Sequence, residues 1–280
     1  MILLSFGHGY SARALTKLLL PQGWRVIGTT RTSEKAEVLR SEGVEPVLWG
    51  EDLSGAIAEA THILTSAGPN ADGDPVLETY GAALAPHLGD KEWVGYLSTT
   101  GVYGDHGGGW VDEETALAPS TRRGQMRVDA EAAWQALCPA VNLFRLAGIY
   151  GPGRGPFEKV RRGTARRIIK QGQVFSRIHV EDIAQVLEAS IRQPNPGAIY
   201  NMCDNDPAPP QDVIGYAAEL LGVPLPEAVD FEVAEMTPMA RSFYAESKKV
   251  SNTRILNELG VTLRYPDYRT GLEALLAAGE

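Results

Sequence analysis

The stretch that decides the fold is Ile2-Leu3-Leu4-Ser5-Phe6-Gly7-His8-Gly9-Tyr10-Ser11-Ala12. An apolar run is followed by Gly-x-Gly-x-x-Ala, and Leu15, Leu18 and Leu19 then recur at helical spacing. In such a motif the first glycine permits a tight turn, the second lets a ligand approach the backbone, and the small third residue lets helix and strand pack closely. The free N–H groups of a helix N-terminus bind phosphate. The stretch predicts a phosphate-binding turn, with a plain tight turn as the alternative; the expected contacts are Gly7, His8, Gly9, Tyr10, Ser11 and Ala12.

Beyond this turn, short apolar runs alternate with helical patterns. Strands are expected at 2–6, 24–29, 46–49, 62–65, 93–98, 141–146 and 198–201, and helices at 10–20, 33–41, 53–60, 75–88, 122–137, 180–191 and 211–221. This order predicts an α/β fold with a Rossmann-type, doubly wound parallel sheet. We expect a dinucleotide-binding domain at 1–156, to which 179–203 returns, and a mainly substrate-binding region at 157–280.

The composition excludes several classes of protein. The chain has 280 residues and a net charge of -9, and a general nucleic-acid binder usually carries a basic excess. Cys138 and Cys203 form no C-x-x-C pair, which argues against a zinc site or a disulfide scaffold and favours a reducing, cytoplasmic location. No apolar stretch approaches the roughly 20 residues that cross a bilayer. We therefore expect no metal, no nucleic acid and no membrane partner, and a small-molecule substrate.

The end of the second expected strand bears on the choice of cofactor. An acidic residue there normally binds the ribose 2′-hydroxyl of NAD. This chain has Thr30-Arg31-Thr32-Ser33 instead, and arginine is suited to a 2′-phosphate. We predict NADP as the cofactor, with contacts from Thr30 and Arg31. NAD stays open, since the alternative is a solvated arginine at a strand end.

Several further motifs resemble one known family. They are Gly50-Glu51-Asp52-Leu53, Ser66-Ala67-Gly68-Pro69, Tyr96-Leu97-Ser98-Thr99-Thr100-Gly101-Val102-Tyr103-Gly104, Arg145-Leu146-Ala147-Gly148-Ile149-Tyr150-Gly151-Pro152-Gly153, Ile178-His179-Val180-Glu181-Asp182-Ile183-Ala184 and Tyr200-Asn201-Met202-Cys203-Asp204. In order and spacing the chain resembles the NAD-dependent epimerase/dehydratase branch of the extended short-chain dehydrogenases/reductases. The resemblance implies that Thr99 bonds the substrate oxygen. It also implies cofactor contacts from Asp52, Leu53, Ser66, Ala67, Gly68, Ser98 and Ala147.

One departure from this family concerns catalysis. The family uses Tyr-x-x-x-Lys on the helix after a glycine-rich loop, and here Arg123 and Arg127 stand at those positions. Arginine stays protonated and is a poor general acid or base. Arg127 remains a candidate for binding ribose or phosphate, and both arginines are candidate site residues beside Thr99. Tyr103, Tyr150 and His106 are the candidate replacements for the tyrosine, although packing is the simpler role for the two tyrosines and a solvated loop position is the simpler one for the histidine.

Two hypotheses follow. The first is an NADP-dependent oxidoreductase or epimerase acting on a small polar, sugar-like or nucleotide-sugar substrate. The second is a catalytically inactive NADP-binding redox sensor or scaffold. The retained motifs favour the enzyme, and the missing pair favours the sensor. By resemblance we expect a homodimer through helices 75–88 and 122–137, where Ala82, Ala83, Ala130 and Ala133 allow close approach. A basic run at 157–170 reads as a solvated helical face or as an anion site shared with Arg122 and Arg123.

Overall fold

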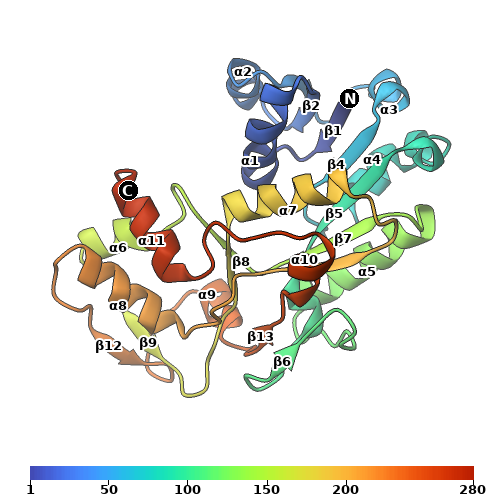
Figure 1. Cartoon of the computed structure of the whole chain (residues 1–280). Helices are drawn as coiled ribbons and strands as arrows, with labels where there is room; N and C mark the ends of the chain where they lie inside the picture. Colours follow the sequence, from blue (N-terminus) through green and yellow to red (C-terminus); the bar gives the residue numbers. More distant parts are fainter.

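A seven-stranded parallel sheet forms the centre of the molecule (Figure 1). The computed structural model describes residues 1–280. The strand order is β11-β7-β5-β4-β1-β2-β3, and every pairing in it is parallel. The strands are β1 (Ile2–Phe6), β2 (Arg25–Thr30), β3 (Glu45–Leu48), β4 (His62–Thr65), β5 (Trp93–Thr99), β7 (Asn142–Leu146) and β11 (Ile199–Met202). This order confirms the predicted Rossmann-type fold.

The sheet is buried on both faces, which explains why its strands lack polar alternation. Successive side chains of a strand point to opposite faces. Leu3 accordingly joins one core cluster, and Leu4 and Phe6 join the other. Each core is completed by its own layer of helices.

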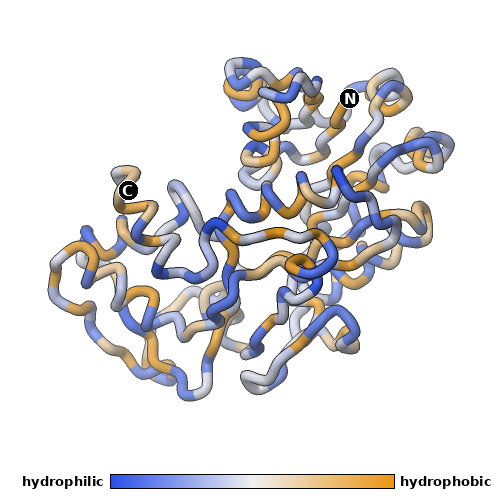
Figure 2. Tube along the Cα trace, viewed as in Figure 1, coloured by the Kyte–Doolittle hydropathy of each residue, from blue (hydrophilic) through white to orange (hydrophobic).

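Helices cover the two faces of the sheet in separate layers. The first core contains side chains from α1 (Tyr10–Leu19), α2 (Ser33–Ser41) and α7 (Val180–Arg192). The second contains side chains from α3 (Ser54–Glu59), α4 (Pro75–Leu84) and α5 (Arg122–Leu137). Figure 2 shows hydrophobic and hydrophilic residues alternating along α7, as expected for a helix that buries one face. None of the helices combines the length and apolarity that a membrane span would need.

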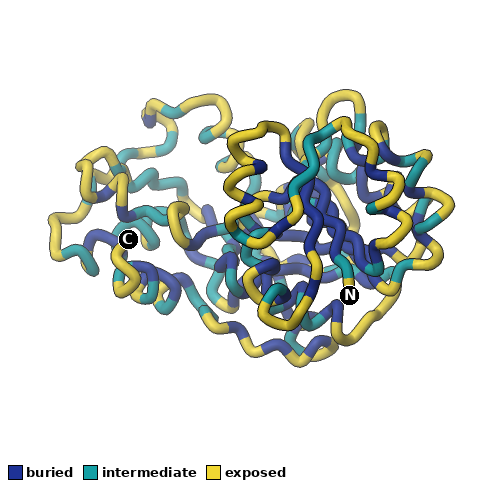
Figure 3. The backbone as a smooth tube through the Cα atoms, turned by 90° about the horizontal axis from the view of Figure 1, so that it is seen from above, coloured by how far each residue is buried: buried dark blue, intermediate teal, exposed yellow.

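A smaller lobe lies beside the sheet and has its own core (Figure 3). Its elements are α6 (Phe157–Arg161), β9 (Arg167–Ile169), α8 (Pro210–Leu220), β12 (Ala228–Asp230), α9 (Pro238–Phe243) and α11 (Tyr268–Ala277). The expected helical face over 157–170 is wrong. Gly163, in a left-handed conformation with φ of 66°, follows α6, and the chain then enters β9, which pairs with β12.

Two short strand pairs tie distant segments together. β8 (Gly148–Tyr150) pairs with β10 (Arg177–His179), and β6 (Trp110–Val111) pairs with β13 (Lys249–Val250). After β13, the helix α10 (Thr253–Glu258) returns to the large lobe, where Ile255 and Leu259 enter the core that α1 and α7 share. The chain therefore passes between the lobes several times.

Candidate functional site

The turn between β1 and α1 has the geometry of a phosphate cradle. Gly7 adopts a φ of 68°, and a Cβ there would lie 2.9 Å from the amide nitrogen of Ala67. Only glycine fits this position without strain. At Gly9 the nearest atom to an added Cβ is 3.6 Å away, so the backbone is open on that side. The turn thus lies directly against the segment that follows β4.

The backbone donors of this turn divide into two groups. The amide of Gly7 donates to the Thr29 hydroxyl at 2.8 Å, and that of His8 donates to the Thr29 carbonyl at 3.0 Å. The amides of Tyr10, Ser11 and Ala12, at the start of α1, have no acceptor within the chain. Free N–H groups at a helix N-terminus are suited to an anion. The cradle therefore fits the diphosphate of a dinucleotide.

Two side chains of the turn contact protein. The His8 ring packs on Gly28, where an added Cβ would lie 2.8 Å from its Cγ, and burial lowers the pKa of His8 to about 4. The Tyr10 hydroxyl donates to the Pro152 carbonyl at 2.9 Å, and Arg154 lies over its ring, 4.4 Å from the centroid. His8 and Tyr10 are thus placed to shape the turn with their side chains.

The end of β2 carries a free cation. Thr30 is buried, and Thr32 accepts from the Lys35 amide at 3.4 Å to cap α2. Arg31 is exposed and forms neither a hydrogen bond nor an ion pair. Its guanidinium is available to a ligand beside the cradle.

The cofactor contacts expected at residues 52–53 and 66–68 differ in exposure and in what they touch. Asp52 is exposed and accepts from the Ser54 amide at 2.9 Å, whereas Leu53 is buried in the core. The Ser66 hydroxyl is buried without a partner. Ala67 abuts Gly7, and Gly68 lines the large cavity described next.

A cavity of about 860 Å³ lies between the two lobes. It brings together residues that are far apart in the sequence. Among the predicted site residues it contains Gly68, Thr99, Arg123, Arg127, Ala147 and Tyr150. Ser98 is directed elsewhere, because its hydroxyl bonds to the buried Glu131.

The two arginines of α5 differ in their contacts. Arg127 donates through Nη1 to the Tyr96 hydroxyl and to the Leu97 carbonyl, both at 2.8 Å. An added Cβ at Gly68 would lie 3.4 Å from its Nη2. Arg127 is therefore anchored on β5 and lies against the segment that follows β4. Arg123 is exposed at the rim of the cavity and has no hydrogen-bond partner.

Thr99 is the last residue of β5, and it lines the cavity. Its Oγ1 accepts from the Gly101 amide at 3.2 Å and keeps its own proton free to donate. Tyr103 is fully buried, donates to Asn201 at 2.7 Å, and lines no part of the cavity. His106 contacts the Tyr103 carbonyl, and His179 accepts from the Glu181 amide at the start of α7.

Tyr150 is the one candidate phenol from the sequence analysis that lines the cavity, which also contains Tyr244. Its hydroxyl lies 3.4 Å from the Asp267 carbonyl, and an added Cβ at Gly271 would lie 2.1 Å from it. Burial raises the pKa of Tyr150 above its ordinary value. Tyr150 is therefore tightly packed and holds its proton firmly.

A buried polar network beneath Thr99 was missed by the sequence reasoning. Glu131 and Arg145 form an ion pair at 2.8 Å, and Arg145 also donates to the Tyr103 hydroxyl at 3.0 Å. The signal was an arginine inside a predominantly apolar strand, since buried charges are rarely left unpaired. This network joins α5, β7 and β11 behind the cavity wall.

The predicted basic cluster does not converge. Of the arginines at 122, 123, 161, 162, 166 and 167, only Arg123 lines the cavity. Arg162 pairs with Glu158 on its own helix. The cations that do line it with Arg123 and Arg127 are Arg154, Arg177 and Lys248, none of which was predicted.

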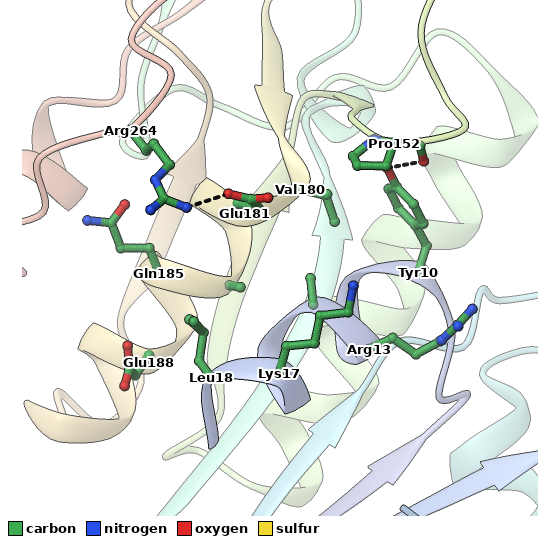
Figure 4. Close-up of a pocket in the computed structure, with 12 residues that line it drawn as sticks. Tyr10, Arg13, Lys17, Leu18, Pro152, Val180, Glu181, Gln185, Glu188 and Arg264 are labelled. Atoms are coloured by element: carbon green, nitrogen blue, oxygen red, sulfur yellow. Dashed lines mark hydrogen bonds and ion pairs between the residues drawn. The ribbon is translucent and has the colours of Figure 1, made fainter. Parts of the chain in front are cut away.

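A second groove, of about 650 Å³, runs between α1 and α7 (Figure 4). Lys17 and Leu18 reach into it from α1, and Gln185 and Glu188 face them from α7. Arg264 closes one end and pairs with Glu181 at 2.7 Å. The groove lies outside the cavity that holds Thr99.

Comparison with known proteins places this architecture among relatives. Protein YeeZ of Escherichia coli K12 is 30% identical over 281 residues, covering 93% of this chain and 95% of that protein. A conserved protein from Silicibacter pomeroyi is 61% identical, with a TM-score of 0.95 over 99% of this chain and 98% of that one. No family model matches the chain.

Structures whose names refer to epimerases or dehydratases share the fold. A putative NAD-dependent epimerase/dehydratase from Methylobacillus flagellatus is 26% identical, with a TM-score of 0.72 over 99% of this chain and 97% of that one. The human epimerase family protein SDR39U1, solved with NADPH, is 19% identical, with a TM-score of 0.79 over 99% of each chain. The cradle, the parallel sheet and these relatives lead to one conclusion: the chain belongs to the same family as protein YeeZ and shares the fold of the NAD-dependent epimerase/dehydratase proteins.

Proposed function

We propose that this protein binds NADP and acts as an oxidoreductase or epimerase on a small polar, sugar-like or nucleotide-sugar substrate. The observation that carries the proposal is the cradle: three unpaired amides at the start of α1, beside a glycine that no other residue can replace without strain. The cradle touches Ala67, and the next residue, Gly68, lines the cavity that contains Thr99. The Methylobacillus relative, named as NAD-dependent, and the human structure with NADPH support a nicotinamide cofactor.

The preference for NADP rests on Arg31. Its guanidinium has no partner within the protein and lies at the end of β2, where an acid would favour NAD. Thr30 and Asp52 flank the same edge of the sheet as further expected contacts. The backbone of Leu53, the Ser66 hydroxyl and the backbone at Ser98 and Ala147 complete the proposed binding surface.

The side chains in the cavity define what chemistry the chain itself contributes. When bound, the nicotinamide ring supplies or accepts a hydride. Thr99 is placed to donate a hydrogen bond to a substrate oxygen, and Arg127 holds a positive charge at the ends of β4 and β5. Arg123 stays protonated and adds charge without proton transfer. The proton therefore comes from water or from a group other than the usual tyrosine.

One observation favours a second candidate function. Arginines occupy both positions of the Tyr-x-x-x-Lys pair, and Arg127 is engaged with Tyr96 and Leu97. A protein that binds NADP without turnover, as a redox sensor or scaffold, would need only the cradle. Turnover of NADPH with a panel of aldehydes and sugar nucleotides separates the two functions.

The assembly and location belong to the same proposal. Ala82 of α4 and Ala133 of α5 are exposed and suited to a homodimer contact, whereas Ala130 is buried in the core and is not. Cys138 and Cys203 are free and buried, which fits a reducing, cytoplasmic environment. Light scattering of the wild type and of Ala133→Arg tests the dimer, and a wild-type monomer would contradict it.

Titration with nicotinamide nucleotides tests the proposed function directly. We expect NADPH to bind the wild type and to raise its melting temperature. Gly7→Ala should abolish this shift because its Cβ meets Ala67. Gly23→Ala is the matched control, since Gly23 has a similar φ of 80° but open space around it. A wild-type protein that binds neither NADPH nor NADH would refute the proposal.

A further inference from the structure

The cavity between the lobes has a strong excess of positive charge. Its lining contains Arg123, Arg127, Arg154, Arg177 and Lys248, and Glu246 is the one carboxylate among the lining residues. Glu246 pairs with Lys248 at 2.6 Å. The four arginines are thus left without a carboxylate in a chain whose net charge is -9. The excess is a property of this site and runs against the overall composition.

Arg177 is the least compensated member of this group. It lies on β10, and its Nη1 donates to the carbonyls of Phe175 at 2.9 Å and Ala208 at 3.0 Å. These two bonds hold the guanidinium in place. Its Nε and Nη2 have no acceptor, and the side chain forms no ion pair. The other three arginines differ, because Arg127 bonds to Tyr96 and Leu97, Arg154 covers Tyr10, and Arg123 is solvated.

The surroundings of Arg177 do not neutralise it. Desolvation lowers the pKa of Arg177, only partly offset by the attraction of Asp204. Asp204 is itself buried and forms no ion pair with Arg177, and desolvation raises its pKa to about 8, which weakens this attraction. Tyr150 and Tyr268 also lie close enough to influence the guanidinium, and both are neutral. Asp206 attracts it as well, but this carboxylate forms its ion pair with Arg269 at 2.7 Å. A partly buried charge without a partner is costly, and a bound anion would remove that cost.

An aromatic wall stands beside this charge. The rings of Phe175 and Tyr244 line the cavity with centroids 5.7 Å apart in an edge-to-face arrangement. Arg177 and Tyr244 are close enough that the guanidinium counteracts the rise in the tyrosine pKa caused by burial. Arg177 and an apolar surface made by these two rings therefore line the same cavity.

We propose that the ligand of this cavity carries an oxyanion, a carboxylate or a phosphate, which binds to Nε and Nη2 of Arg177 while its apolar part packs on Phe175 and Tyr244. The adjacent Nε–H and Nη2–H groups form the fork that receives two oxygens at once. The inference refines the proposed function by naming the chemical class of substrate. It rests on that function for its catalytic meaning, and the binding site itself is tested separately.

Calorimetric titration of the full chain with three small probes tests the site. Benzoate and phenyl phosphate carry the two oxyanions on a planar ring, and benzamide is their neutral counterpart. We expect at least one anion to bind the wild type about 10- to 100-fold more tightly than benzamide. Arg177→Gln should lower the affinity for that anion to the affinity that benzamide shows. The anion that binds more tightly, benzoate or phenyl phosphate, shows whether the site prefers a carboxylate or a phosphate.

The control variant is Arg166→Gln, which changes an exposed arginine that does not line the cavity. It should bind each probe as the wild type does. Anions that bind no better than benzamide would overturn the inference, and so would unaltered binding to Arg177→Gln. An equal loss in Arg166→Gln would likewise overturn it, by pointing to general charge attraction.

A chemical measurement on the wild type covers the case in which Arg177→Gln does not fold. Phenylglyoxal modifies accessible arginines, and mass spectrometry locates the sites. We expect the tighter anion to protect Arg177 and to leave Arg166 reactive. An Arg177 that reacts equally with and without the anion, or that never reacts, would overturn the inference.

Parallel titration with NADPH keeps the two proposals apart. Arg177-dependent anion binding by a protein that takes up no nicotinamide nucleotide would leave this inference standing and remove the proposed function. NADPH binding by a protein that does not prefer the anions to benzamide would support the proposed function and remove this inference.

Discussion

Nη2 of Arg145 lies 2.8 Å from Oε2 of Glu131, and both side chains are almost completely buried. Glu131 also accepts a hydrogen bond from the Ser98 hydroxyl, and Arg145 donates one to the Tyr103 hydroxyl. Removing one partner leaves the other as an uncompensated buried charge. We therefore expect Glu131→Ala to lower the free energy of unfolding by about 3–5 kcal/mol, measured by urea denaturation. Glu37→Ala, which breaks the exposed pair with Arg40, is the control and should change little; a similarly small change in Glu131→Ala would show that the pair does not support the cavity wall.

Cofactor preference should depend on Arg31. Without its guanidinium a 2′-phosphate loses a charge-assisted contact, which is typically worth about 1.5–3 kcal/mol. Arg31→Ala should weaken NADPH binding about 10- to 100-fold and leave NADH binding nearly unchanged. The measurement is a fluorescence titration with both nucleotides. Arg40→Ala, at the far end of α2, should match the wild type, and an Arg31→Ala protein with undiminished NADPH affinity would refute the proposed preference.

Thr99 should affect turnover more than cofactor binding. Its hydroxyl is the donor we place on the substrate oxygen, and removing one such donor typically lowers kcat about 10²-fold. Thr99→Ala should therefore reduce kcat for any substrate that the panel identifies, with NADPH affinity within about twofold of the wild type. Thr121→Ala removes a helix cap at the cavity edge and serves as the control for general destabilisation. Equal kcat in Thr99→Ala and wild type would remove Thr99 from the proposed chemistry.

The stability of the protein should fall as Asp204 ionises. Desolvation raises the pKa of Asp204 from 3.8 to about 8, so the folded chain binds this proton more tightly than the unfolded chain does. The folded state is then favoured at low pH, and this contribution declines from about pH 4 to pH 8. Asp204→Asn cannot ionise and should melt at least about 2 °C higher than the wild type at pH 9. Below pH 4 the gap should close; a constant gap at all pH values would show that ionisation is not its cause.

Much of the fold was predictable because its signals are local. The strands at 2–6 and 62–65 and the helices at 33–41 and 122–137 were predicted with the bounds that the structure has. Two helix predictions ran too long by four residues or more. α4 ends at Leu84, where Pro86 prevents continuation, and α6 ends before Gly163. Such ends depend on one residue that interrupts an otherwise continuous pattern.

The site was predictable where one segment builds it and not where several do. The cradle from Gly7 to Ala12 is a single turn, and its glycine has the conformation the motif implies. Arg177 reaches the cavity because β10 pairs with β8, and Lys248 because β13 pairs with β6. No pattern within either segment announces those pairings. The basic run at 157–170 illustrates the opposite error, because sequence neighbours there diverge in space.

The return of α10 to the large lobe limits how the chain can be divided. Ile255 and Leu259 enter the core that α1 and α7 share, although they follow nearly all of the smaller lobe in sequence. A fragment ending near residue 203 would expose the apolar surface they cover, and aggregation would be its expected fate. Excision of the intervening segment, with 1–156, 179–203 and 245–264 rejoined by linkers, is the shorter route to an autonomous nucleotide-binding unit.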